Sequence, residues 1–276
     1  MSKVWFITGT SRGIGLEIAK AVLAAGDRVV ATARNRSSIP LPSDERRLLT
    51  LDLDVTSPAQ SESAVRAAVE SFGQIDVLVN NAGYGQLGTF EELTVEQIEA
   101  QFSTNVFGLF NVTRALLPVM RRQRSGRIFN LSSTAGIAGS PGASIYCASK
   151  FAVEGFSEAL AAELEEFGIG VTIVEPGPFR TDFLDDRSVR HATASITDYA
   201  QASARRKAAY DARNHNQGGD PARLAAALLG LVSNDDVPLR FAAGSPAVDL
   251  VLRKAEGLAA EVARFRDLSA STDWQG

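Results

Sequence analysis

Tyr146 and Lys150 are the two residues whose types and spacing best suit proton-transfer chemistry. They lie four residues apart, a spacing that puts the phenol and the ammonium on one face of a helix. A free tyrosine has a pKa near 10, so proton transfer at neutral pH asks for a downward shift of roughly 2–3 units. One ammonium at about 4–5 Å supplies on the order of 4 kcal/mol at an effective dielectric constant near 20. We therefore expect Lys150 to lower the pKa of Tyr146.

Ser133 lies thirteen residues before Tyr146 and follows a predicted strand, GRIFNLS. A loop rich in glycine, serine and proline then returns the chain to Tyr146. A serine hydroxyl beside the phenol can hydrogen-bond a substrate carbonyl or alcohol oxygen and hold it in place. The alternative is a surface Tyr–Lys pair on a helix, because the Y-x-x-x-K spacing also occurs by chance. We interpret the neighbouring Cys147 as a small buried residue rather than a nucleophile.

The composition is that of a globular chain with a large apolar core. Of its 276 residues, 45% are hydrophobic and 22% are charged, and the length suits one α/β domain. A net charge of −4 and a pI near 5.4 argue against nucleic acid as a main partner. No apolar run reaches the roughly 18 residues of a membrane span, and the N-terminal stretch has no signal-peptide pattern. We therefore expect a cytoplasmic protein with no membrane span.

Residue types that bind metals are sparse. The single cysteine, Cys147, rules out an internal disulfide and a cysteine-based metal cluster. The two histidines, His191 and His215, show no H-x-x-x-H spacing. We therefore predict no metal site.

A glycine-rich turn follows the first predicted strand, residues 3–8. Gly9, Gly13 and Gly15 form a G-x-x-x-G-x-G spacing that runs into a helix ending at Gly26. Such a loop lets backbone N–H groups approach a pyrophosphate, while the helix N-terminus offers partial positive charge. The spacing differs from the G-x-G-x-x-G dinucleotide fingerprint, although the physical logic is the same. The alternative is an ordinary tight turn between strand and helix.

Strand patterns then recur with helical patterns between them. Most are continuous apolar runs, which is typical of a parallel sheet covered on both faces. The predicted strands are residues 3–8, 28–33, 47–53, 75–80, 127–132, 170–176 and 238–244. Ser57-Pro58 and Asp220-Pro221 each indicate a helix N-cap followed by proline at the first helical position. The alternation predicts an α/β fold with a doubly wound sheet in a single domain over 1–276.

The carboxyl ends of the strands in such a sheet form the ligand-binding edge. Glycine-rich and polar residues gather at the predicted strand ends. In chain order they are Gly9 to Gly15, Arg34, Asp54-Val55, Asn80 to Gly83, Ser133 and Pro176-Gly177. We therefore expect one site along this edge.

Two further features concern surfaces. The predicted helices 105–122 and 147–167 are rich in apolar and small residues, which favours an interface in a homodimer or homotetramer over simple burial. Residues 179–219 are polar and follow the sixth strand, so we expect a mobile lid with an amphipathic helix at 196–213, rather than a surface insertion. A C-terminal extension, about residues 245–276, has no assigned role.

Several motifs in this order resemble the short-chain dehydrogenase/reductase family over about residues 3–244. They are TGTSRGIG (8–15), NNAG (80–83), Asn105, Ser133 followed by Gly136, YCASK (146–150) and PG (176–177). The resemblance implies a three-layer doubly wound Rossmann fold with a seven-stranded, mainly parallel sheet. It also implies hydride transfer between NAD(P)(H) and a small-molecule carbonyl or alcohol. A regulatory protein that senses the cofactor without turnover is the alternative.

The resemblance also implies residue roles. Tyr146 is the expected acid–base catalyst, Ser133 the partner of the substrate oxygen, Lys150 a ligand of the nicotinamide ribose, and Asn105 the holder of a water in the proton relay. Asp54 and Val55 are expected to meet the adenine, and Asn81 to support the central sheet. The expected cofactor-binding residues are Gly9, Thr10, Ser11, Arg12, Gly13, Ile14, Gly15, Arg34, Asp54, Val55, Asn81, Ala82, Gly83, Tyr146, Lys150, Pro176, Gly177 and Thr181.

The end of the second strand predicts which cofactor is preferred. A dinucleotide fold that prefers NAD usually has an acidic residue there, which accepts the ribose hydroxyls. This chain instead reads Ala33-Arg34, and a guanidinium suits a 2′-phosphate. Arg12 in the glycine loop is the second candidate, whereas the alternative makes both arginines solvated surface residues. Two charged hydrogen bonds, at roughly 1.5–3 kcal/mol each, predict that NADP(H) is preferred over NAD(H).

Overall fold

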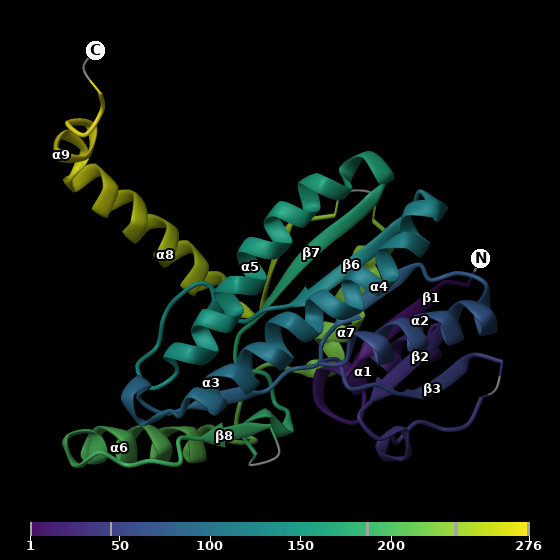
Figure 1. The fold of residues 1–276 in the computed structure, drawn as a ribbon, viewed down its shortest axis with the longest axis horizontal. Coiled ribbons are helices and arrows are strands. Elements are labelled where there is room, and N and C mark those ends of the chain that lie inside the picture. The colour runs from purple at the N-terminus through teal and green to yellow at the C-terminus, as the bar shows by residue number, and fades with distance from the viewer. Residues whose placement is uncertain (1, 45, 186–187, 235–236, 275–276) are drawn as a thin grey trace.

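Seven parallel strands form one sheet at the centre of the computed structural model, which describes residues 2–44, 46–185, 188–234 and 237–274 (Figure 1). Their order is β3-β2-β1-β4-β6-β7-β9, so the chain reverses its direction of travel between β1 and β4. The strands are β1 (Val4–Thr8), β2 (Arg28–Ala33), β3 (Leu48–Asp52), β4 (Val77–Asn80), β6 (Gly126–Leu131), β7 (Ile169–Pro176) and β9 (Arg240–Ala243). The predicted doubly wound α/β fold is confirmed, and all seven strands are parallel.

Helices cover both faces of the sheet and make the two outer layers (Figure 1). The α-helices are α1 (Gly13–Ala24), α2 (Pro58–Phe72), α3 (Val95–Phe102), α4 (Gly108–Gln123), α5 (Ser144–Leu164), α6 (Thr197–Arg213), α7 (Pro221–Val232), α8 (Ser245–Arg264) and α9 (Arg266–Ala270). A π-helical turn, η3 (Ser103–Phe107), leads into α4. The short 3₁₀ turns are η1 (Arg36–Ser38), η2 (Phe90–Glu92), η4 (Thr134–Gly136), η5 (Glu165–Phe167) and η6 (Asp182–Leu184).

The continuous apolar run of β1 supplies two cores at once. Val4 and Phe6 pack into the core on the α2, α4 and α5 side. Trp5 and Ile7 point the other way and pack against α1 and α7. Successive side chains of a strand alternate between the faces of the sheet, so a strand buried on both faces must be apolar at every position.

The two helix starts predicted at Ser-Pro and Asp-Pro are confirmed. The Ser57 hydroxyl accepts a hydrogen bond from the Gln60 backbone N–H at 3.3 Å, and Pro58 opens α2. The Asp220 carboxylate accepts from the Ala222 N–H at 2.8 Å before α7. These caps satisfy amide groups that the first helical turn leaves without a partner.

Residues 179–219 leave the sheet edge and return to the same point. A bridge pairs Phe179 with Gly219, and the Arg180 N–H donates to the Gly219 carbonyl at 2.8 Å. Between these ends, β8 (Val189–His191) pairs in parallel with β5 (Gly85–Leu87), and α6 follows. The helix predicted at 196–213 is confirmed, whereas the β5–β8 pair was not predicted, because neither three-residue stretch has a strand pattern of its own.

The chain after β9 forms α8 and α9, which project away from the rest of the molecule (Figure 1). Contacts at the start of α8, with β9 and η4, root the helix. Among the described residues, no helix combines the length and apolar character needed to cross a bilayer.

Candidate active site

The glycine loop lies where β1 ends, beside the loop that follows β4. A Cβ atom on Gly9 would come within 3.0 Å of the Ala82 Cα atom, and one on Gly15 would collide with the Asn81 side chain. Gly9 and Gly13 have φ values of 73° and 60°, a region that favours glycine. The sequence therefore needs glycine here both for backbone shape and for the close approach of two loops.

Asn81 connects these two loops by hydrogen bonds. Its side-chain amide donates to the carbonyls of Thr8 at 2.8 Å and Gly9 at 3.1 Å. The backbone N–H groups of Asn81 and Ala82 both donate to the Thr8 hydroxyl at 3.0 Å. Asn81 thus ties the ends of β1 and β4 together, which agrees with the supporting role expected from the family resemblance.

Thr10 fixes the other side of the glycine loop. It is fully buried, and both its N–H, at 3.0 Å, and its hydroxyl, at 3.2 Å, donate to the Thr32 carbonyl in β2. Ser11, Arg12 and Ile14 are partly exposed at the start of α1. Helix α1 begins at Gly13, soon after β1 ends, so the positive end of its dipole lies near the carboxyl end of that strand, and the Arg12 side chain forms no cap hydrogen bond with its first turn.

Ser133, Tyr146 and Lys150 converge at the adjacent strand end. Ser133 follows β6 and caps η4, and its hydroxyl accepts from the Ala135 N–H at 3.1 Å. Tyr146 and Lys150 lie on the first two turns of α5, with the ammonium 5.9 Å from the phenol ring centroid. The structure therefore brings together three of the four side chains predicted to be catalytic, the fourth being Asn105.

The expected lowering of the Tyr146 pKa is wrong for this structure. Burial in an apolar environment disfavours the phenolate and raises the pKa of Tyr146 to about 12. Hydrogen bonding with Ser133 acts in the opposite direction but is the smaller effect, and Cys147 and Tyr210 add to the rise. The Lys150 ammonium donates a hydrogen bond to the Leu131 carbonyl at 2.7 Å, and its charge does not outweigh the effect of burial on the Tyr146 pKa.

Lys150 is itself a buried cation. Burial lowers its pKa to about 8, and the charge of Glu154, one helical turn further along α5, acts in the opposite direction. Lys150 therefore keeps its proton at neutral pH. Its hydrogen bond to Leu131 anchors it at the end of β6, on the same side of α5 as Tyr146.

A cluster of charged side chains, two of them buried carboxylates, lies beneath this lysine, and the sequence did not reveal it. Arg240 in β9 donates through Nη1 to Glu154 and, at 3.0 Å, to the fully buried Glu175. Burial raises the pKa of Glu154 to about 7, while the charge and hydrogen bond of Arg240 oppose the rise. Arg240 lies 86 residues from Glu154 and 65 residues from Glu175 along the chain, so no local sequence pattern could predict the cluster.

Asn105 lies in the π-helical turn and is buried beside the site. Its side-chain amide donates to the Tyr84 carbonyl at 2.9 Å and accepts from the Tyr84 N–H at 3.1 Å. It also donates to the Ser149 hydroxyl at 3.3 Å, next to Lys150 on α5. A Cβ atom on Gly83 would approach the Asn105 Oδ1 atom at 3.1 Å. Asn105 therefore connects the loop after β4 to α5.

The segment after β7 reaches back over the glycine loop. The Gly177 N–H donates to the Ala243 carbonyl at 3.0 Å, directly after Pro176 ends β7. Thr181 caps η6, and a Cβ atom on Gly13 would lie 3.8 Å from the Thr181 Cβ atom. Of the predicted cofactor-binding residues Pro176, Gly177 and Thr181, Thr181 thus lies beside the glycine loop.

An apolar cluster encloses Tyr146 on the side of residues 179–219. The Phe183 ring lies 5.9 Å from the Tyr146 ring, measured between centroids. The cluster consists of Leu87, Ala143, Cys147 and Val189, with Ala135, Tyr146, Phe183, Leu184 and Tyr210 packed against it. Cys147 is buried within it, as expected. The Tyr146 environment is therefore apolar and shared between α5 and the segment predicted to be a lid.

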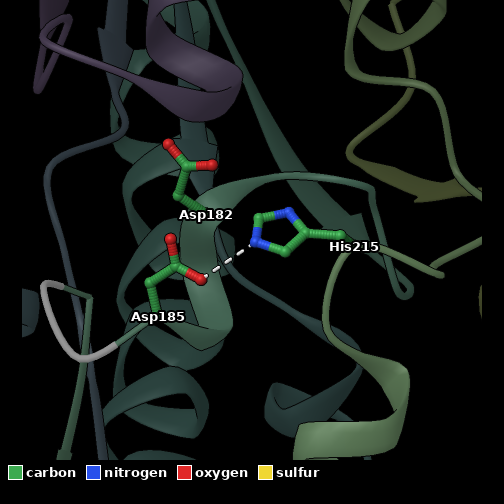
Figure 2. Close-up of side chains that lie close together, drawn as sticks. All are labelled: Asp182, Asp185 and His215. Atoms are coloured by element: carbon green, nitrogen blue, oxygen red, sulfur yellow. Dashed lines mark ion pairs between the residues drawn. The ribbon is translucent and has the colours of Figure 1, made fainter.

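A group of polar side chains joins the two ends of this segment, and the sequence spacing did not indicate it (Figure 2). Asp185 accepts hydrogen bonds from Asn214 Nδ2 at 2.7 Å and lies 3.2 Å from His215 Nε2. One possible ligand atom each of Asp182, Asp185 and His215 lies within 4.8 Å of the others. These contacts fasten η6 to the loop after α6.

Arg34, Asp54 and Val55 lie at the ends of β2 and β3, on the same edge of the sheet. Arg34 is exposed, and none of the described residues forms an ion pair with it. The carboxylate nearest in the sheet register is Asp52, opposite Ala33, and it accepts a hydrogen bond from the Arg36 N–H at 2.7 Å. Asp54 accepts from the Thr56 N–H at 3.0 Å, and the Val55 carbonyl accepts from Asn111 at 3.0 Å.

The sequence over residues 3–191 matches the family model described as short chain dehydrogenase. The chain belongs to the short-chain dehydrogenase family. Oxidoreductase BOA17 of Botryotinia fuckeliana (strain B05.10) is 39% identical over 279 residues, which cover 99% of this chain and 100% of that protein. A 3-ketodihydrosphingosine reductase of Bacteroides thetaiotaomicron is 38% identical over 255 residues, 92% of both chains.

Two solved structures share the fold. A short-chain dehydrogenase from Streptomyces avermitilis superposes with a TM-score of 0.89 at 38% identity, covering 99% of this chain and 100% of that one. The structure of ElxO with NADP bound has a TM-score of 0.70 at 26% identity, covering 87% of this chain and 96% of that one. The protein is an oxidoreductase that uses a nicotinamide cofactor.

The glycine loop of this short-chain dehydrogenase fits such a nucleotide. The loop and the uncapped first turn of α1 lie where the strand order reverses between β1 and β4, the position at which doubly wound sheets bind dinucleotides. Backbone N–H groups of the loop would hold the pyrophosphate, and Lys150 and Tyr146 lie further along the same edge.

Proposed function

We propose that the chain is an NADP(H)-dependent oxidoreductase that transfers a hydride between the nicotinamide and a carbonyl or secondary alcohol. The observation that carries this proposal is the convergence of Ser133, Tyr146 and Lys150 at one strand end, beside the glycine loop. The bound cofactor supplies or accepts the hydride at the substrate carbon. The side chains of the protein transfer the proton and hold the substrate in position.

The residues have distinct parts in carbonyl reduction. The Ser133 hydroxyl hydrogen-bonds the carbonyl oxygen and holds it towards Tyr146. Tyr146 donates its proton to that oxygen as the carbon accepts the hydride, so the carbonyl becomes an alcohol. A phenol whose pKa burial has raised to about 12 holds its proton until negative charge develops on the substrate oxygen. Alcohol oxidation is the reverse.

Lys150 has two functions in the proposed reaction. It binds the nicotinamide ribose, and its ammonium stabilises the phenolate that remains after the proton leaves. The anchored position, 5.9 Å from the ring centroid, suits an electrostatic role. In water-excluded surroundings such a charge acts more strongly than it would in water.

The substrate side of the site favours an apolar molecule. Phe183, Leu184 and Tyr210 pack against the same apolar cluster as Tyr146. Apolar walls with a few placed polar groups are typical of small-molecule sites. A 38% identical relative is named for reducing a keto group. We therefore expect a ketone or secondary alcohol with an apolar body.

The absence of an acidic residue at the end of β2 supports the NADP(H) preference. Ala33 ends the strand, and Arg34 is exposed and unpaired among the described residues. A planar guanidinium suits a phosphate group. Asp52, the neighbouring carboxylate, is occupied by Arg36.

The test is NADPH and NADH oxidation with a panel of apolar ketones and matched polar ones. We expect turnover with apolar ketones and a kcat/KM at least about tenfold higher with NADPH. Tight nucleotide binding without turnover of any carbonyl or alcohol would instead indicate a cofactor-sensing regulatory protein.

A further inference from the structure

Helix α8 carries an apolar face that the described chain leaves largely uncovered. It extends away from the sheet, with α9 at its far end (Figure 1). Only its start is rooted: Ala247 is fully buried, whereas Leu252, Leu258 and Val262 are 57%, 49% and 67% exposed. Isolated helices are marginal in water, and packing of an apolar face normally supplies most of their stability. A 20-residue projecting helix therefore needs a partner along this face.

The apolar positions of α8 follow a heptad pattern. Taking Val248 as position a, all six a and d positions up to residue 265 are apolar: Val248, Val251, Ala255, Leu258, Val262 and Phe265. The b, c and f positions are mostly charged or small. A 3.5-residue apolar repeat places one seam along a helix, which is the pattern by which two helices pair.

The residues that flank this seam carry complementary charges. Lys254 and Glu261 occupy successive g positions, and Leu252 and Ala259 occupy the e positions. In an antiparallel pair with Ala255 opposite the partner's Leu258, each Lys254 lies next to the partner's Glu261. The two-fold symmetry makes that ion pair twice, and the e positions meet as an apolar contact.

A parallel pair of α8 helices would bring fewer opposite charges together. There each Lys254 lies opposite the partner's Ala259, so its charge has no complement. Glu261 meets Arg266 only near the helix end. Membrane binding is also disfavoured, because residues 245–274 hold four basic and five acidic side chains, whereas helices that lie on membranes are usually rich in Lys and Arg.

We propose that α8 is a docking surface for a second copy of this chain, in which the two α8 helices pair antiparallel through the Val248–Phe265 seam. This interface is separate from the face of α4 and α5, where Phe107 and Phe151 are exposed and where the sequence also favours an interface. An antiparallel, two-fold arrangement places the two sheets at opposite ends of the helix pair. It also closes on itself, so it yields a defined assembly rather than a filament.

Charge reversal in the full-length protein tests the pairing and its direction. Lys254→Glu and Glu261→Lys alone each put like charges in contact twice and should weaken assembly roughly tenfold, measured by analytical ultracentrifugation. The double variant Lys254→Glu/Glu261→Lys restores both pairs and should return the dissociation constant to that of the wild type. Leu258→Asp should halve the assembled mass while thermal unfolding and turnover stay unchanged.

Cysteine cross-linking supplies a second readout that does not depend on affinity. The native Cys147 is buried, so added thiols report on α8 alone. An equimolar mixture of Val248→Cys and Phe265→Cys proteins should form a disulfide-linked dimer, whereas Val248→Cys alone should not. Cross-linking by Val248→Cys alone, an assembled mass unchanged in Leu258→Asp, or a monomer that binds phosphatidylserine vesicles would each overturn the proposal.

Discussion

The Phe183 ring lies 5.9 Å from the Tyr146 ring between centroids, with the two planes inclined at 48°. This contact joins the segment after β7 to the helix that carries the proposed catalyst. Phe183 also approaches Gly85 of β5, where a Cβ atom would lie 3.4 Å from its ring. Residues 179–219 therefore form one wall of the space beside Tyr146.

Phe183→Ala should remove part of that wall. We expect KM for an apolar ketone to rise about tenfold or more, since burial of such a ring is worth roughly 1.5–3 kcal/mol, while the Kd for NADPH stays within several-fold. Trp274→Ala is the matched aromatic control, because Trp274 is 91% exposed near the C-terminus. Steady-state kinetics in which both variants behave alike would show that Phe183 does not contact substrate.

The contacts of residues 188–213 predict a lid that opens. Many are side-chain bonds to neighbouring segments, such as Tyr199 to Glu91 at 2.9 Å and Gln97 to the His191 carbonyl at 3.0 Å. No residue of α6 is fully buried, so little apolar burial opposes opening. Hydrogen exchange should be faster here than in β1 and β4, and NADPH with substrate should slow it. Equal exchange with and without ligand would contradict a lid.

Cofactor preference should move with two residues at the end of β2. Ala33→Asp with Arg34→Ala adds a carboxylate that repels a 2′-phosphate and removes the guanidinium. We expect the ratio of kcat/KM for NADPH to that for NADH to fall below one. Arg36→Ala is the control, because Arg36 is paired with Asp52 and should leave the preference unchanged. A preference that the double variant does not alter would place the 2′-phosphate site elsewhere.

The buried Glu154 predicts a pH dependence of stability. Its pKa is raised from 4.5 to about 7, so the folded state binds more protons than the unfolded state between these values. The stabilising contribution is therefore fully present below about pH 4.5 and is lost as the pH rises through 7. Glu154→Gln removes this titration, so the free energy of unfolding should change less between pH 5 and pH 8 than in the wild type.

Glu158→Gln is the matched control for that measurement. Glu158 lies one turn further along α5 and pairs with the same guanidinium at 2.7 Å, but its side chain is 60% exposed. Urea unfolding at several pH values should show that the free energy of unfolding of this variant changes with pH as it does in the wild type. If the free energy of unfolding of Glu154→Gln changed with pH as much as that of the wild type, the buried Glu154 carboxyl group would not be the source of the pH dependence.

The sequence predicted the sheet because each strand is locally recognisable. Apolar runs such as VWFIT at β1 are buried on both faces, and the caps at Ser57 and Asp220 depend only on neighbouring residues. The proximity of the proposed catalytic residues was also predictable, because Tyr146 and Lys150 share one helix and Ser133 follows a strand. Local spacing was enough for both.

Tertiary packing decided what the sequence could not show. The sign of the Tyr146 pKa shift depends on burial by residues such as Tyr210, far along the chain. The β5–β8 pair joins Gly85 to Val189, and the cluster beneath Lys150 joins α5 to β9. Neither the strand pair nor the cluster has a periodic or capping signal, so neither could be predicted from local sequence.

The central claim is that Tyr146 transfers the proton. Tyr146→Phe keeps the ring but removes the hydroxyl, whereas Tyr210→Phe removes the other phenol of the same apolar cluster. NADPH oxidation with an active ketone should fall by about 10²–10⁴-fold in Tyr146→Phe, while its Kd for NADPH stays within several-fold and Tyr210→Phe retains most activity. More than a tenth of wild-type turnover in Tyr146→Phe would contradict the account.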